Sequence, residues 1–275
     1  MNPGDQLPSA PRPLAVNAAR PSPDAARERT NEVLISVRDV SVGWDETPLL
    51  EHLDFEVPRR DVFAILGGSG CGKSTLLRNL VGLDPPMSGE IEIAGVGRPE
   101  ADVGRPAFGM TFQAGALFGS MTVGDNVALP LREWTSLPPD AVEAVVRAKL
   151  GLVGLAGFEN HTPAEISGGM KKRAAIARAL ALDPELVFLD EPSAGLDPVT
   201  AAELDELIIA LNRGLGVTVV LVTHELSSIY AVAKHCIMLD KETKGIIARG
   251  DPKELRDHSD DEKVRNFFHR EARSS

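Results

Sequence analysis

The chain has 275 residues, enough for one large domain or two small ones. Its apolar fraction of 43% and charged fraction of 25% are those of a globular protein with a packed core. The formal net charge of −11 argues against a nucleic-acid-binding protein, because such a protein needs a basic face to displace counterions. We therefore expect no nucleic-acid partner.

The cysteine content argues against a scaffold built on disulfides. Only Cys71 and Cys236 are present, one in a glycine-rich loop and one in an apolar run, so we expect a reducing compartment. No apolar run reaches the roughly 18 residues that span a bilayer, and no signal-peptide core lies near the N-terminus. These features predict a cytosolic protein that reaches a membrane only through a partner.

The first 30 residues differ from the rest of the chain. They hold six prolines and six alanines with mixed charges and no periodicity, which predicts a disordered tail and a passive extension. From Val33 onward, residues 34–42, 53–57 and 90–93 lean towards alternation of apolar and polar side chains. This alternation predicts antiparallel strands with one solvent-exposed face.

A glycine-rich loop lies between a predicted buried strand (62–66) and a predicted helix (75–80). Its sequence, GGSGCGKS, matches the phosphate-loop pattern without a gap. Glycines let several backbone N–H groups point at one anion, and the following helix adds its positive end. We expect Lys73 to reach the β- and γ-phosphates of ATP and the Ser74 hydroxyl to bind Mg²⁺. The predicted nucleotide-binding residues of this segment are Gly67, Gly68, Ser69, Gly70, Cys71, Gly72, Lys73, Ser74 and Thr75.

Gln113 follows a short strand-like piece, residues 110–112. The carbonyl oxygen of a glutamine at this place can reach Mg²⁺ or an attacking water, although the pattern is weak by itself. Residues from about 114 to 175 are rich in helix formers and hold no strong strand run.

A second candidate anion site begins at Ser167. Ser167 is a good helix N-cap, and the sequence after Gly168 and Gly169 is strongly helical. One ATP does not need two such cradles from one chain, but two chains arranged head to tail would use both. The motif therefore predicts a dimer with shared sites, with an ordinary capped helix as the alternative.

Two short apolar strands, 186–189 and 217–222, follow. The helix between them carries its apolar residues at helical spacing, and Gly214 and Gly216 are predicted to close it. Alternating strands and helices predict a parallel sheet with helices on its faces.

Polar residues follow both strands, where a parallel sheet binds its ligands. Asp190 is predicted to hold Mg²⁺ through a water, and Glu191 to polarise the water that attacks the γ-phosphate. His224 is placed to donate to the γ-phosphate and orient that water. The alternatives are a capping or solvated acidic pair and a structural histidine.

In order and spacing, these motifs resemble those of the ATP-binding subunit of ABC transporters over roughly residues 33–255. Residues 67–74 resemble Walker A, Gln113 the Q-loop glutamine, 166–170 the signature motif, 186–191 Walker B with its catalytic Glu191, 193–197 the D-loop, and His224 the switch histidine.

The resemblance implies an α/β P-loop NTPase fold. Its RecA-like core has a mainly parallel sheet and carries an antiparallel β subdomain and an α-helical subdomain at about 114–175, followed by a C-terminal extension at 256–275. It also implies ATP hydrolysis with Mg²⁺, with Glu191, His224 and Gln113 as catalytic residues. The metal ligands would be Ser74, Gln113 and Asp190. Further nucleotide contacts would come from Trp44, Ser167, Gly168, Gly169 and Asp197, with Trp44 stacking on adenine where tyrosine is more usual.

Met170 and Ile166 depart from the common signature, which has glutamine and leucine there. Met170, together with residues 112–118, 125–131, 250–255 and 260–268, resembles the Mla branch, which includes the MCE and solvent-tolerance systems. That resemblance implies a motor for phospholipid transport between the inner and outer membranes, at the cytoplasmic face of the inner membrane. The implied partners are a membrane permease, a second copy of this chain and an MCE lipid-binding subunit.

Three alternatives remain open at this point: transport of another solute, a non-transport ABC ATPase, and a metabolite kinase. The signature motif disfavours the kinase, and the acidic single domain disfavours the non-transport ATPase. Leu117, Phe118 and Met121 likewise have two interpretations: they line a groove for a permease helix, or they fill the core of the helical subdomain.

Overall fold

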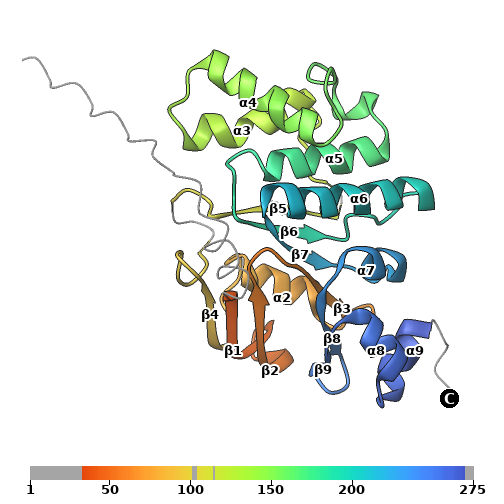
Figure 1. The fold of residues 1–275 in the computed structure, drawn as a ribbon. Coiled ribbons are helices and arrows are strands. Elements are labelled where there is room, and N and C mark those ends of the chain that lie inside the picture. The colour runs from red at the N-terminus through yellow and green to blue at the C-terminus, as the bar shows by residue number, and fades with distance from the viewer. Residues whose placement is uncertain (1–32, 101–103, 114, 270–275) are drawn as a thin grey trace, which may run out of the picture.

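The computed structural model describes residues 33–100, 104–113 and 115–269. The predicted tail, 1–30, lies outside the described residues, as do the last six residues of the predicted C-terminal extension. Within the described part, two sheets and their helices form successive layers, with a helical subdomain at one end (Figure 1).

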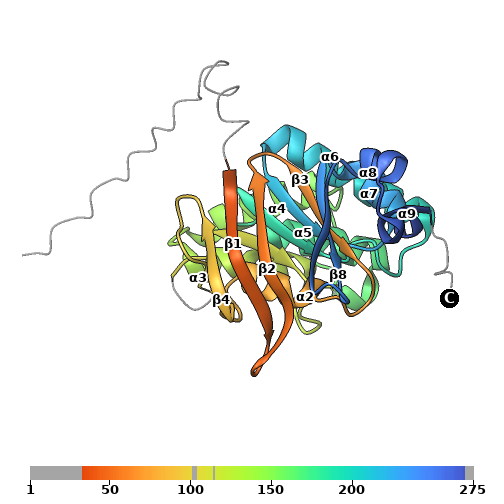
Figure 2. The same ribbon diagram turned by 90° about the horizontal axis from the view of Figure 1, so that it is seen from below.

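An antiparallel sheet forms the opposite end, in the strand order β2-β1-β4 (Figure 2). Its strands are β1 (Val33–Trp44), β2 (Thr47–Pro58) and β4 (Ser88–Ile93). Leu53, Phe55 and Val57 are buried, whereas Asp54 and Glu56 between them are exposed. The alternation predicted from the sequence is therefore confirmed, because one face of this sheet packs on the core and the other meets solvent.

The second sheet has the order β5-β6-β7-β3-β8-β9, and its neighbours are parallel except for β8 and β9. Its strands are β3 (Val62–Gly67), β5 (Phe108–Thr111), β6 (Leu186–Asp190), β7 (Thr218–Val222), β8 (His235–Asp240) and β9 (Gly245–Gly250). Every residue of β3 and β7 is buried, as expected for a parallel sheet covered on both faces. The carboxyl ends of β3, β6 and β7 consequently meet at one edge.

Two helices place the functional loops. Helix α2 (Lys73–Leu80) shares a hydrophobic core with both sheets, so the phosphate loop is held between them. Helix α6 (Pro198–Leu215) covers the other face and ends where predicted, at Gly216, whose φ of 70° suits a left-handed C-cap. The predicted terminating role of Gly214 is wrong, because Gly214 lies inside the last turn and Gly216 alone supplies the positive φ.

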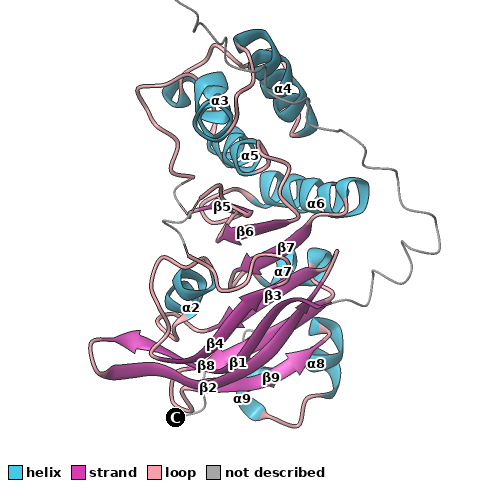
Figure 3. Cartoon of the chain, turned by 90° about the vertical axis from the view of Figure 1, so that its left-hand side faces the viewer, coloured by secondary structure: helices cyan, strands magenta, loops and turns pink. Residues whose placement is uncertain are grey.

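The helical subdomain contains α3 (Val123–Trp134), α4 (Pro139–Leu152), a 3₁₀ turn η2 (Pro163–Glu165) and α5 (Gly168–Ala179) (Figure 3). These helices share one hydrophobic core with α6 and one face of the parallel sheet. Helix α5 therefore contacts the subdomain and the nucleotide-binding core at once.

Three helices complete the described chain: α7 (Leu226–Val232), α8 (Pro252–His258) and α9 (Glu262–His269). Val264 and Phe268 of α9 pack on β3 and β8 in a third hydrophobic cluster. None of the helices in the described residues is both long and apolar enough to cross a membrane.

Candidate nucleotide-binding site

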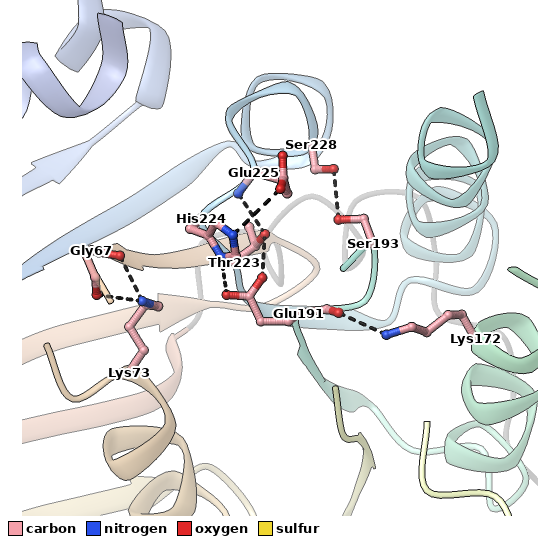
Figure 4. A network of polar contacts seen from close by, with 10 residues as sticks. Gly67, Lys73, Lys172, Glu191, Ser193, Thr223, His224, Glu225 and Ser228 are labelled. Atoms are coloured by element: carbon pink, nitrogen blue, oxygen red, sulfur yellow. Dashed lines mark hydrogen bonds and ion pairs between the residues drawn. The ribbon is translucent and has the colours of Figure 1, made fainter. Parts of the chain in front are cut away.

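The phosphate loop turns sharply between β3 and α2. A Cβ on Gly67 would lie 2.5 Å from Cys71 Sγ and 2.6 Å from the Leu239 carbonyl oxygen, so no larger residue fits there. The buried Lys73 folds back, and its Nζ donates to the Gly67 and Gly68 carbonyl oxygens at 2.8 and 3.0 Å (Figure 4). The carbonyl oxygens of the loop thus hold a positive charge inside it.

A pocket of about 550 Å³ opens over this loop. Its walls combine loop residues with side chains from four other parts of the chain: Gly67, Gly68, Ser69, Gly70, Lys73, Ser74, Gln113, Glu191, His224, Leu226 and Phe267. The structure therefore brings the three predicted catalytic residues to the phosphate loop, although 40 to 150 residues separate them from it in sequence.

Glu191 lies at the end of β6 and is fixed from the neighbouring strand β7. Its Oε1 lies 2.7 Å from His224 Nδ1, and its Oε2 accepts a hydrogen bond from Thr223 Oγ1 at 3.3 Å (Figure 4). Its backbone N–H donates to the Val222 carbonyl oxygen at 2.8 Å. A φ of 47° is costly for a glutamate, so this network holds the carboxylate in a strained position over the pocket.

Asp190 presents a buried carboxylate oxygen towards the same edge. Within the described residues, its Oδ1 is buried without a hydrogen-bond partner. Burial raises the pKa of Asp190, and the negative charge of Glu191 raises it further, while Lys73 and Lys172 oppose the shift. A buried acceptor without a partner is costly, so this atom fits a bound cation or its water shell.

The remaining donor set also suits Mg²⁺. The described residues contain no cluster of three or more His, Cys, Asp or Glu side chains. Mg²⁺ is normally bound by one or two protein groups together with waters and substrate phosphates, so it needs no such cluster. Ser74, exposed in the first turn of α2, and Gln113 both line the pocket and offer neutral oxygens.

The second anion site lies at the N-terminus of α5. Ser167 Oγ accepts a hydrogen bond from the Met170 N–H at 3.3 Å, which confirms the predicted N-cap. A Cβ on Gly169 would come within 2.4 Å of the Thr200 side chain, so this turn packs directly on the start of α6.

Asp197 caps that neighbouring helix. Its Oδ1 accepts hydrogen bonds from the Val199 and Thr200 N–H groups, each at 3.1 Å. Ser167, Gly168, Gly169 and Asp197 therefore lie close together, yet none of them lines the phosphate-loop pocket of its own chain. Their role in a partner's site stays a prediction.

Some predicted nucleotide contacts lie outside the pocket lining. Trp44 stands 59% exposed at the end of β1, and its stacking on adenine stays a prediction. Cys71, Gly72 and Thr75 are buried and do not line this pocket, so their contacts with a nucleotide stay predictions.

Four further residues at the site were missed from the sequence, one of which is Leu226 of α7 in the pocket lining. Thr223 directly precedes His224 at a strand end, so its position in the sequence could have indicated its contact with Glu191. Lys172 of α5 donates to the carbonyl oxygens of Glu191, at 3.1 Å, and Gln113. Phe267 of α9 lines the pocket and had no local signal, because only packing brings α9 to the loop.

Leu117 and Phe118 have different environments. Leu117 is partly buried against the core of the helical subdomain. Phe118 is 50% exposed, although Asn126 bonds both its N–H, at 2.8 Å, and its carbonyl oxygen, at 3.1 Å. The core-filling interpretation thus holds for Leu117, whereas the Phe118 side chain lies at the surface and its backbone is bound to Asn126.

Comparison with known proteins identifies the family. The sequence model described as "ABC transporter" matches residues 50–194. The chain is 42% identical over 241 residues to the intermembrane phospholipid transport system ATP-binding protein MlaF of Escherichia coli K12, covering 86% of this chain and 88% of that protein. It is 41% identical to the "Probable ribonucleotide transport ATP-binding protein mkl" of Mycobacterium tuberculosis H37Rv, and the match covers 86% of this chain and 66% of that protein.

Solved structures have the same architecture. CbiO1 from Clostridium perfringens, part of the ABC transporter complex cbiONQ, superimposes with a TM-score of 0.74 at 29% identity, covering 83% of this chain and 92% of that one. The dimeric cassette MJ0796 bound to ADP and phosphate superimposes with a TM-score of 0.70 at 28% identity, and the match covers 79% of this chain and 98% of that one. These matches confirm the predicted P-loop NTPase fold with its antiparallel β subdomain. The chain belongs to the ABC transporter family and is the ATP-binding, ATP-hydrolysing motor subunit of such a transporter.

Proposed function

We propose that this chain drives phospholipid transport between the inner and outer membranes, with a membrane permease and an MCE lipid-binding protein. The observation that carries the proposal is the 42% identity to MlaF, which extends over 86% of this chain and 88% of that protein. Met170 in the signature motif supports the same branch. The motor acts at the cytoplasmic face of the inner membrane and need not touch lipid itself.

In the proposed site, ATP phosphates lie in the loop 67–74 beside Lys73. Glu191 accepts a proton from the attacking water, and His224 and Gln113 orient that water and the γ-phosphate. The contacts of Glu191 with His224 and Thr223 support these roles, because they aim the carboxylate into the pocket. Ser74, Gln113 and Asp190 hold Mg²⁺, which supplies charge neutralisation to the phosphates when bound.

The proposed active form is a dimer of two copies of this chain. Ser167, Gly168, Gly169 and Asp197 lie together outside their own pocket, which leaves them available to a partner's ATP. The similarity to the dimeric MJ0796 cassette supports this arrangement. Because the γ-phosphate then contacts both subunits, ATP binding favours closure and hydrolysis reverses it.

The permease is proposed to dock on the helical subdomain. A pocket of about 780 Å³ lies between α3 and α4. Its lining includes the apolar residues Ala128, Leu137, Val142 and Val146 and the charged residues Asp125, Arg132, Glu143, Arg147 and Glu159. The exposed Phe118 belongs to the same subdomain. A short permease helix that carries both apolar and charged side chains would fit this surface.

Transport of another solute is the alternative, since the mycobacterial relative with a ribonucleotide-transport name is 41% identical over the same length. The test is to purify the chain with the membrane proteins that accompany it and to reconstitute them in vesicles. ATP-dependent transfer of labelled phospholipid, abolished by Glu191→Gln, is the expected result. Transfer of labelled ribonucleotide without phospholipid would overturn the proposal, and so would purification without a multi-span permease.

A further inference from the structure

Two cations of the signature helix α5 bind main-chain oxygens of the catalytic loops. Lys172 Nζ donates to the carbonyl oxygen of Gln113 and, at 3.1 Å, to that of Glu191 (Figure 4 shows the second contact). Arg178 Nη1 donates to the Ala116 carbonyl oxygen at 2.7 Å, and its Nη2 to that of Gly115 at 3.1 Å. One helix therefore holds four carbonyl groups on two separate segments.

These carbonyl groups belong to backbone outside regular helices and strands. Gly115, Ala116 and Glu191 have φ values of 75°, 47° and 47°, so their carbonyl oxygens lie outside a regular ladder, although that of Glu191 also accepts the Ala194 N–H at 3.2 Å. Hydrogen bonds from charged donors are roughly twice as strong as neutral ones. The two cations thus stabilise a strained conformation that the local sequence does not favour.

Both side chains are partly buried where they make these bonds. Burial lowers the pKa of the Lys172 ammonium, while the charges of Asp190 and Glu191 partly restore it. Burial likewise lowers the pKa of Arg178. Partial burial costs each cation part of its hydration free energy. The hydrogen bonds to the loop carbonyl oxygens must compensate for this cost.

We propose that Lys172 and Arg178 clasp the Gln113 loop and the Glu191 peptide to α5, so that the position of the signature helix sets the catalytic geometry of Gln113 and Glu191. Neither cation lines the phosphate-loop pocket, so both are positioning residues. A displacement of α5 would therefore displace the Gln113 loop and the Glu191 peptide with it.

The first test compares Lys172→Met with Lys172→Arg, and uses Lys171→Met as the matched control on the same helix. ATP hydrolysis is measured on the full chain with the partners that co-purify with it. We expect Lys172→Met to lower kcat roughly 10-fold with little change in KM, because nucleotide contacts are untouched while the reacting groups are misplaced. Lys172→Arg should restore most of kcat, and Lys171→Met should keep it.

Two outcomes would overturn the clasp: a kcat of Lys172→Met within about twofold of the parent, or an equal loss in Lys171→Met. A double-mutant cycle gives a further test, in which Lys172→Met is also made in a Gln113→Ala variant. Because Lys172 is proposed to act partly through Gln113, its substitution should cost less there than in the parent. Fully additive losses would contradict the proposal.

A second measurement covers Arg178 and involves no catalysis. Hydrogen exchange of peptides spanning residues 112–121 should quicken in Arg178→Met, with residues 139–152 of α4 as the internal control. Unchanged exchange in 112–121, or equal quickening in α4, would contradict the clasp. Neither test uses a transported solute, so a failure of the clasp is distinguishable from a failure of the proposed transport function.

Discussion

Glu191 and His224 lie in contact at the ends of neighbouring parallel strands, with 2.7 Å between Glu191 Oε1 and His224 Nδ1. The two residues are 33 positions apart in sequence, and the pairing of β6 with β7 joins them. The two side chains bind one another, and both line the phosphate-loop pocket. A bound γ-phosphate and water would therefore meet a carboxylate and an imidazole that are already oriented.

The first prediction concerns the proposed base. Glu191→Gln should still bind ATP but lose turnover by roughly 10²–10⁴-fold, because an amide has no basic oxygen to accept the proton of water. Steady-state phosphate release and equilibrium binding of ATP measure the two effects separately. Near-normal turnover in this variant would reject the role of Glu191.

The second prediction concerns the phosphate loop. Lys73→Ala should weaken ATP binding at least 10-fold, because the loop loses the cation that its own carbonyl groups hold in place. Arg78→Ala, on the exposed face of the same helix, is the control and should leave binding unchanged. Calorimetric titration with ATP gives both affinities, and equal affinities for the two variants would count against the site.

The third prediction concerns the shared site. Ser167→Arg, made together with Glu191→Gln, should leave ATP binding to one subunit intact but prevent ATP-induced dimerisation. An arginine at the α5 N-terminus would place its bulk and charge where the partner's nucleotide is proposed to lie. Size-exclusion chromatography with light scattering in ATP reports the oligomer. Persistent dimers would show that this helix end does not receive the partner's ATP.

The fourth prediction concerns Trp44, one of two tryptophans in the chain. If adenine stacks on it, ATP should quench its fluorescence, and Trp44→Ala should weaken binding about fivefold, an amount typical of one stacking contact. Trp44→Tyr should bind normally. Replacing the other tryptophan, Trp134→Phe, should leave the quenching in place, and quenching that disappeared there instead would exclude the stacking role.

The fifth prediction concerns the buried Asp205 of α6. Burial raises its pKa to about 6, although a hydrogen bond with Ser228 opposes the shift. The folded state therefore holds this proton more tightly than the unfolded chain, whose aspartates titrate near 3.9. The ionised carboxylate costs stability above pH 6, and the cost disappears as pH falls from about 6 to about 4.

Asp205→Asn should accordingly raise the free energy of unfolding by about 2 kcal/mol near neutral pH and by much less near pH 4. Denaturant unfolding at several pH values provides the measurement. Asp257→Asn, at an exposed position, is the control. An equal gain in the free energy of unfolding at both pH values would show that it does not come from the cost of ionising the buried Asp205.

The sequence alone determined the parts of this protein that depend on short-range physics. The phosphate loop needs glycines where the backbone takes positive φ, and Ser167 and Gly216 stand where helices begin and end. Continuous apolar runs predicted the covered parallel strands, and alternation predicted the half-exposed sheet. These features are encoded within a few residues of one another, so reading the chain in order was sufficient.

Only the tertiary structure decided which distant groups meet. Strand pairing brought Glu191 to Thr223 and His224, and helix packing brought Lys172 to the carbonyl oxygens of Gln113 and Glu191. Docking of α9 likewise brought Phe267 to the pocket. Such contacts depend on the packing of surfaces that are far apart in the chain, and a cation that binds a carbonyl oxygen leaves no pattern in the side chain of its acceptor.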